Sequence, residues 1–123
     1  MTARTMSDAS QTAVEVLGEP AFDGARLRRP GRWAVAFVAD WCPFCRRFRP
    51  RFEALAGALP CSLAFADVTS EESPLWDVFG IEVIPTVVAF QDGAVVGRVD
   101  GRAGEDFGPG DLDRVRALFP SRP

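Results

Sequence analysis

Short apolar runs along the chain predict the strands of a sheet. The run from Trp33 to Ala39 is almost continuously apolar, which is typical of a central strand covered on both faces. Ser62 to Val68 is a second run of strand length, and Ala13 to Leu17 alternates well enough for a short strand. Thr86 to Phe90 and Ala94 to Val99 flank Asp92-Gly93 and predict an antiparallel hairpin.

Helical spacing appears between these runs. From Cys45 to Leu59 apolar residues recur three and four positions apart, and Pro50 lies inside this helix. Phe22 to Arg29 predicts a short helix, and Ser73 to Gly80 predicts another with a serine cap. Asp111 to Phe119 predicts a final amphipathic helix. Strands separated by helices indicate one α/β domain in three layers, over residues 13–121, after a polar N-terminal segment 1–12 that we expect to be flexible.

Composition excludes several kinds of chemistry. The 123 residues are 47% hydrophobic, which fits one globular core, but they include no histidine, no tyrosine and no lysine, since all fourteen basic residues are arginine. Histidine acid/base catalysis, Schiff bases and histidine metal sites are therefore excluded. The net charge of −3 does not indicate nucleic-acid binding. The polar N-terminus lacks a signal peptide's apolar core, and no run approaches the roughly 20 apolar residues of a membrane span, so we expect a cytoplasmic protein.

Charge is unevenly distributed along the chain. Residues 40–51 hold four arginines and one acid, whereas the five acids of residues 67–82 have no basic neighbour in that segment. Both stretches are interpreted as solvated surface, because runs of like charge usually lie on a solvated face.

Two cysteines mark the candidate chemistry. They lie where the longest apolar strand gives way to a helix, in the sequence Trp41-Cys42-Pro43-Phe44-Cys45-Arg46. Residues three apart at a helix start are one turn from each other, close enough for a disulfide. The helix dipole favours a negative charge at its N-terminus, so Cys42 is expected to ionise more readily than a free cysteine and to act as a nucleophile. Cys45, one turn deeper, is the shielded partner that attacks back.

A structural role for the cysteines is the alternative. Half of a zinc site would need two more ligands, and without histidine only Cys61 is to spare, so a zinc site would have to bridge a dimer. We therefore expect no metal. Cys61 is interpreted as a small buried apolar residue. Trp33 and Trp76 are interpreted as core.

These motifs together resemble the thioredoxin family. The resemblance extends from about Ala13 to Phe119 and rests on Trp-Cys-x-x-Cys after a buried strand, Pro50, Ile84-Pro85-Thr86 and the Asp-Gly hairpin. It implies a thioredoxin fold, a mixed sheet of four or five strands with helices on both faces. It also implies that Cys42 attacks a substrate disulfide and that Cys45 resolves the mixed disulfide, with no bound cofactor.

The resemblance also assigns a substrate-binding edge. Trp41 would pack beside the cysteines, and Pro85 would be a cis-proline facing them. Ile84 would offer backbone N–H and C=O groups with which an extended substrate pairs as an added strand.

Two departures from the family pattern concern proton transfer and tuning. The family usually places a buried aspartate six residues before the first cysteine, where this chain has Ala36, so water or Asp40 would have to take the proton of Cys45. Pro43 and Phe44 replace the usual Gly-Pro and would tune the dithiol together with Arg46 and Asp40.

The predicted function is reduction of protein disulfides in the cytoplasm. We expect a monomer that is recharged by an upstream reductase such as a thioredoxin reductase. One alternative is a glutathione-linked, glutaredoxin-like protein, indicated by the Pro-aromatic dipeptide and opposed by the N-terminal strand and helix. The other is a redox-dependent binding module with little turnover, which the loss of the carboxylate at Ala36 favours.

Overall fold

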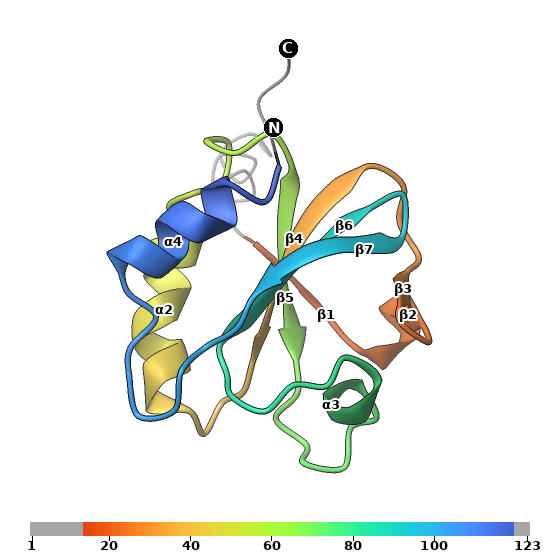
Figure 1. Cartoon of the computed structure of the whole chain (residues 1–123). Coiled ribbons are helices and arrows are strands. Elements are labelled where there is room, and N and C mark those ends of the chain that lie inside the picture. The colour runs from red at the N-terminus through yellow and green to blue at the C-terminus, as the bar shows by residue number, and fades with distance from the viewer. Residues whose placement is uncertain (1–13, 120–123) are drawn as a thin grey trace, which may run out of the picture.

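The computed structural model describes residues 14–119 and builds them around one mixed sheet (Figure 1). The strand order is β1-β5-β4-β6-β7, so that β4 is central. The pairs β1–β5 and β4–β5 are parallel, and the pairs β4–β6 and β6–β7 are antiparallel. The strands of this sheet are β1 (Glu15–Leu17), β4 (Arg32–Val38), β5 (Ser62–Asp67), β6 (Thr86–Gln91) and β7 (Ala94–Val99).

Three α-helices cover the two faces of the sheet. They are α2 (Pro43–Glu53), α3 (Leu75–Val78) and α4 (Pro109–Arg116). Figure 1 shows α2 and α4 together on one face and α3 on the other side of the sheet. The fold is therefore the three-layer α/β arrangement predicted from the sequence.

Phenylalanine side chains fill the space between the layers. On the α3 side, Phe37 of β4 and Phe79 lie with their ring centroids 5.2 Å apart, and Phe22 and Phe90 join them. On the α2 side, Phe52 lies 5.4 Å from Phe65 of β5. The central strand is fully enclosed between these clusters, because residues 34–38 have no exposed surface. Burial on both faces explains its continuous apolar sequence.

The helix predicted for Phe22 to Arg29 is wrong. A 3₁₀ turn, η1 (Glu19–Ala21), leads into a small hairpin of β2 (Phe22–Asp23) and β3 (Arg26–Leu27). Gly24 has a φ of 60°, in the left-handed region that glycine adopts without strain. Asp23-Gly24 is therefore a turn signal, and it breaks the helical spacing of the apolar residues around it.

Both long helices end earlier than their apolar spacing predicts. After Glu53 the backbone changes to tighter bonds between residues three apart, such as Leu55 N–H to the Phe52 carbonyl at 2.9 Å. Gly57 has a φ of 83°, which prevents the helix from resuming. Leu55 is nevertheless 5% exposed, so its apolar position marks the core rather than the helix. The same tightening follows Arg116, where α4 ends before Phe119.

The flexible segment predicted for residues 1–12 lies outside the described residues. Within residues 14–119, none of the helices has the length and apolar character needed to cross a membrane.

Candidate active site

Cys42 lies at the junction of the central strand and α2. Its backbone is extended (φ −95°, ψ 112°) and it is the N-cap of the helix, followed by Pro43 at the first helical position. Proline is favoured there because its missing N–H needs no partner in the first turn. The strand and helix thus hold the cysteine at the carboxyl end of β4, where the sequence predicted it.

The two cysteines are joined by a hydrogen bond. The Cys45 N–H donates to the Cys42 Sγ over 3.1 Å, and the Cys42 thiol donates to the Ile84 carbonyl over 3.8 Å. Both are free thiols in this structure. Cys42 is 3% exposed and Cys45 is fully buried, so the attacking thiol expected from the sequence is nearly as enclosed as its partner. A substrate sulfur has only a narrow approach to Cys42.

Burial disfavours ionisation of the Cys45 thiol. Loss of solvation raises the pKa of the Cys45 thiol well above its ordinary value of 9.0, and its hydrogen bond with Cys42 raises the pKa further. The positive charge of Arg49, one helical turn along α2, acts in the opposite direction and lowers this pKa. Cys45 therefore keeps its proton in the resting dithiol and needs help to release it.

Ala36 supplies no carboxylate at the position where the family usually has a buried aspartate. It is fully buried on β4 and pairs with Phe65 of β5, whose ring faces α2. Asp40, the nearest carboxylate predicted from the sequence, has a side chain that is 79% exposed. The Asp40 carboxylate lies 3.8 Å from the Arg49 guanidinium, which also sits 4.9 Å from the ring of Phe65. The sequence alone did not identify Arg49 as a site residue, because it is one of four arginines in a stretch that we interpreted as solvated surface.

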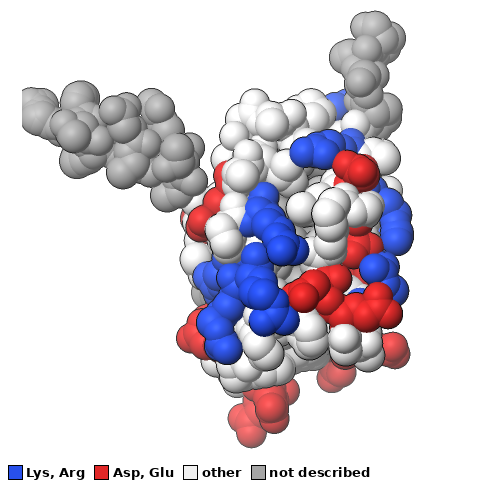
Figure 2. Space-filling model, turned by 90° about the vertical axis from the view of Figure 1, so that its left-hand side faces the viewer, with Lys and Arg blue, Asp and Glu red and all other residues white. Residues whose placement is uncertain are grey.

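The residues predicted to tune the dithiol surround the start of α2. Pro43 is exposed and Phe44 is half-buried, with the Arg47 guanidinium 5.3 Å from its ring. Arg46 donates to the backbone carbonyl of Asp40 over 3.3 Å and forms no ion pair with the Asp40 carboxylate within residues 14–119. Figure 2 shows basic side chains gathered on the face of α2 and α4, with acidic side chains beside them.

Ile84 and Pro85 form the opposite wall of the site. The peptide bond between them is cis, and both side chains are buried. Thr86 anchors this segment: its hydroxyl donates to the Val83 carbonyl over 2.6 Å and accepts the Gly101 N–H over 3.1 Å. A Cβ on Gly101 would lie 2.5 Å from the Pro85 carbonyl oxygen, so only glycine fits this crossing.

Trp41 and Trp76 stack beside the cysteines. Their ring centroids are 6.3 Å apart with only 10° between the planes. Trp41 is 49% exposed, whereas Trp76 is partly buried and packs against the core, as predicted. The loop after β5 holds both rings, because the Nε1–H groups donate to the carbonyls of Thr69 (2.8 Å) and Ser70 (3.1 Å). Thr69 also accepts the Asp40 N–H through its hydroxyl at 2.9 Å and thereby ties this loop to the active site.

Cys61 lies apart from this site, before β5. It is partly buried, and loss of solvation raises the pKa of its thiol to about 11. Within residues 14–119, no group of three or more histidine, cysteine, aspartate or glutamate side chains is placed to hold a metal ion.

Comparisons with known proteins agree with this geometry. A model of the Thioredoxin family matches residues 13–107. The chain is 33% identical over 97 residues to protein disulfide-isomerase A3 of Gallus gallus, covering 76% of this chain and 19% of that protein. It is 34% identical over 80 residues to the thioredoxin of Rhodospirillum rubrum, covering 64% of this chain and 77% of that protein.

A solved structure shows the same fold. Mitochondrial thioredoxin 3 of Saccharomyces cerevisiae superposes with a TM-score of 0.68 at 23% identity, over 89% of this chain and 99% of that one. Because the family model spans most of the chain and the paired cysteines occupy the start of a helix after a buried central strand, the chain belongs to the thioredoxin family.

Proposed function

We propose that the protein reduces disulfides in other proteins, a specific form of the thiol–disulfide oxidoreductase activity that its family supports. The observation that carries the proposal is the 3.1 Å hydrogen bond from the Cys45 N–H to the Cys42 sulfur at the N-cap of α2. A backbone N–H at a helix N-terminus stabilises a negative sulfur, and the thiolate is the form that attacks disulfides.

The reaction passes two electrons from the dithiol to the substrate. The Cys42 thiolate attacks one substrate sulfur, forms a mixed disulfide and expels the other substrate sulfur as a thiolate, which takes up a proton. Cys45 then loses its proton and attacks the Cys42 sulfur. A Cys42–Cys45 disulfide forms, and the second substrate sulfur leaves as a thiolate. An upstream reductase, such as a thioredoxin reductase, returns the two electrons.

Trp41, Ile84 and Pro85 are proposed to bind the substrate. The Ile84 carbonyl accepts the Cys42 thiol hydrogen at 3.8 Å, so an extended segment paired with the Ile84 backbone would carry its disulfide to the sulfur. Trp41 borders the same approach with half of its surface exposed.

Proton release from Cys45 is proposed to use water or the Asp40 carboxylate. Asp40 is open to solvent and Arg49 lies beside it. The guanidinium helps by stabilising the Cys45 thiolate, since its charge lowers the pKa that burial has raised.

Insulin reduction tests the proposal. In dithiothreitol the protein should accelerate insulin precipitation, and Cys42→Ser or Cys45→Ser should abolish the acceleration. Cys61→Ser is the matched control that removes a thiol outside the site and should keep full activity. The reduction potential of the Cys42–Cys45 couple should be about −270 mV, whereas a value of about −120 to −180 mV would overturn the reductant role.

The glutaredoxin-like alternative keeps one sequence cue, the Pro43-Phe44 dipeptide between the cysteines. The helix at residues 22–29 that counted against it is absent from the structure. Turnover with glutathione and glutathione reductase, but not with thioredoxin reductase, would establish this alternative.

We also propose a monomer that works in the cytoplasm. Size-exclusion chromatography of the reduced protein at several concentrations tests the monomer, and fractionation of cells that express the tagged full chain tests the location. A constant elution volume and recovery in the cytoplasmic fraction are expected.

A further inference from the structure

Trp41 presents aromatic surface to solvent and stacks on Trp76, which is partly buried against the core. The phenylalanine clusters on the two faces of the sheet do not include Trp41 or Trp76. The polar Nε1–H groups of both indoles are already occupied by the loop carbonyls of Thr69 and Ser70. The part of Trp41 that remains toward solvent is its apolar ring surface, and this residue directly precedes Cys42 in the sequence.

The structure leaves about half of the Trp41 side chain exposed to solvent. Val78, two residues after Trp76, is 40% exposed as well. Large aromatic side chains contribute most when they are covered, so the exposed ring of Trp41 beside a reactive thiol points to a contact surface for a partner.

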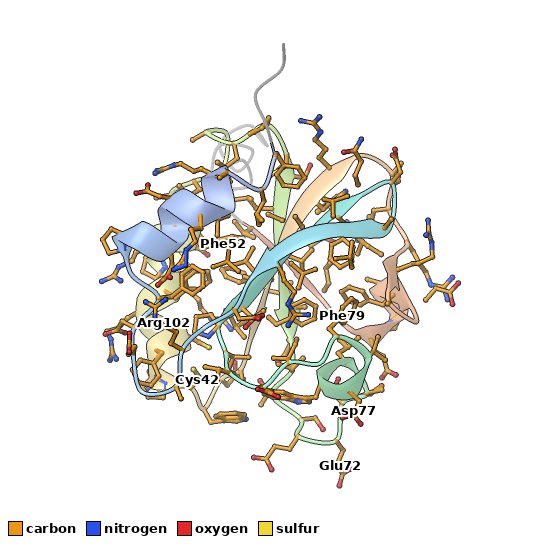
Figure 3. The ribbon with its side chains drawn as sticks, in the orientation of Figure 1. Cys42, Phe52, Glu72, Asp77, Phe79 and Arg102 are labelled. Carbon is orange, nitrogen blue, oxygen red and sulfur yellow. The ribbon has the colours of Figure 1, made fainter. Side chains whose placement is uncertain are left out.

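Three acidic residues lie near Trp76 in the sequence. Glu71, Glu72 and Asp77 are exposed on the loop and helix that carry Trp76. Within residues 14–119 none of these three forms an ion pair, so their carboxylates are free to accept a cation. Figure 3 shows Glu72 and Asp77 at the same end of the molecule as Cys42, and Figure 2 shows acidic side chains projecting from this lower end.

We propose that Trp41 and Trp76, with Glu71, Glu72 and Asp77, form a subsite for a basic side chain that lies within a few residues of the substrate's disulfide cysteine. A guanidinium or ammonium group gains from the face of an indole and from nearby carboxylates at once. The inference rests on the proposed function and names its substrate class: proteins whose accessible disulfide is flanked by arginine or lysine.

Positive charge on the other side of Cys42 determines how the substrate is oriented. Arg46 and Arg47 are exposed on the first turns of α2, so a second cation there would be repelled. A substrate therefore places its basic residue toward Trp76 and keeps its other flank neutral or acidic.

Three disulfide peptides test the subsite. Each is made in two forms, with the lysine, glutamine or glutamate before the cysteine or after it, and kcat/KM for reduction is measured at low and high salt. In one of the two forms the lysine peptide should be reduced about five times faster than the glutamine peptide at low salt, and the advantage should shrink at high salt because exposed charges are screened.

Two variants assign the effect to these residues. The double variant Glu72→Gln/Asp77→Asn should lower the lysine preference to about twofold or less, while reduction of the glutamine peptide stays unchanged and reports an intact fold. Trp76→Ala should lower the ratio of the two kcat/KM values in the same way, with both peptides losing the contact to the aromatic pair. Glu53→Gln is the matched control, because it removes one exposed acid at the far end of α2 and should leave the preference intact.

The outcomes separate the two proposals. Equal kcat/KM for all three peptides, or a lysine preference that survives both variants, overturns the subsite while the reductase function stands. Failure to reduce any of the peptides overturns the reductase function and the subsite with it.

Discussion

The two cysteines differ at the residue scale in what surrounds them rather than in how much of them is exposed. Cys42 receives a backbone N–H at the helix start, whereas Cys45 is enclosed and its pKa is raised by burial. The proposed roles of Cys42 as nucleophile and Cys45 as resolving thiol rest on this difference, since the exposed fractions are only 3% and 0%.

The raised pKa of Cys45 predicts a pH-dependent stability of the reduced protein. Because the folded state favours the neutral thiol, this contribution is fully present below the ordinary value of 9.0 and is lost as the pH rises above it. In a Cys61→Ser background, urea unfolding of the reduced protein should show a loss of up to about 1.4 kcal/mol per pH unit above pH 9. The Cys45→Ser counterpart should lose less, and equal slopes would contradict the assignment.

Arg49 offers a second prediction at this scale. Replacing it with glutamine removes a positive charge that lowers the pKa of Cys45, so the resolving step should slow by about two- to fivefold at pH 7. Single-turnover release of a peptide from the mixed disulfide measures this step, and Arg49→Lys should restore most of the rate. A slower attack by Cys42 with unchanged release would show that Arg49 acts elsewhere.

At the element scale, α4 depends on one buried carboxylate. Asp111 is 2% exposed and accepts the Gly108 N–H over 2.9 Å at the start of the helix. Arg102 binds both of its oxygens, at 2.8 and 3.1 Å, and Arg114 lies 3.2 Å away. Burial alone would raise the pKa of Asp111, but these hydrogen bonds and charges together hold it below its ordinary value of 3.8.

Asp111→Asn should therefore destabilise the protein by about 2 kcal/mol at pH 7, because the arginines lose a charged partner and Gly108 a strong acceptor. The contribution of the carboxylate is present above pH 3.8 and is lost as the pH falls below it, so the difference between the two proteins should narrow in acid. Thermal unfolding at pH 7 and pH 3 measures both. A constant difference would show that packing, rather than charge, carries the effect.

Elements with a long local pattern could be predicted from the sequence, and elements fixed by tertiary contacts could not. The central strand and the helix after it have unbroken apolar spacing, and the β6–β7 hairpin has its Asp-Gly turn. The β2–β3 hairpin has strands of only two residues each, too short for a period to show. Its pairing of Phe22 with Leu27 comes from the turn at Gly24 and from the cluster that encloses Phe22.

The same limit applies to the site. The positions of the cysteines and of Ile84-Pro85 follow from motifs, because each motif sits at a strand end. The stacking of Trp76 on Trp41 joins residues 35 positions apart through a loop that contacts both, and no local spacing carries it. In the sequence, the stacking is indicated only by the presence of Trp76 in the acidic segment 67–82.

At the scale of the whole molecule, the sheet order brings the reactive features to one end. The carboxyl end of β4 supplies the cysteines, the loop after β5 supplies the tryptophan support, and the segment before β6 supplies Ile84. Figure 3 shows Cys42 at this end of the molecule, away from the C-terminal end of α4. One end of the molecule therefore holds both the cysteines and the residues that we propose to bind the substrate.

The central claim is that Cys42 attacks and Cys45 resolves, and intact-mass spectrometry after mixing with a disulfide-linked peptide tests it most directly. The Cys45→Ser variant, in a Cys61→Ser background, should gain the mass of one peptide thiol, and dithiothreitol should remove it. The Cys42→Ser variant should gain none, because Cys45 is buried and protonated. A stable adduct on Cys42→Ser, or none on Cys45→Ser, would contradict the account.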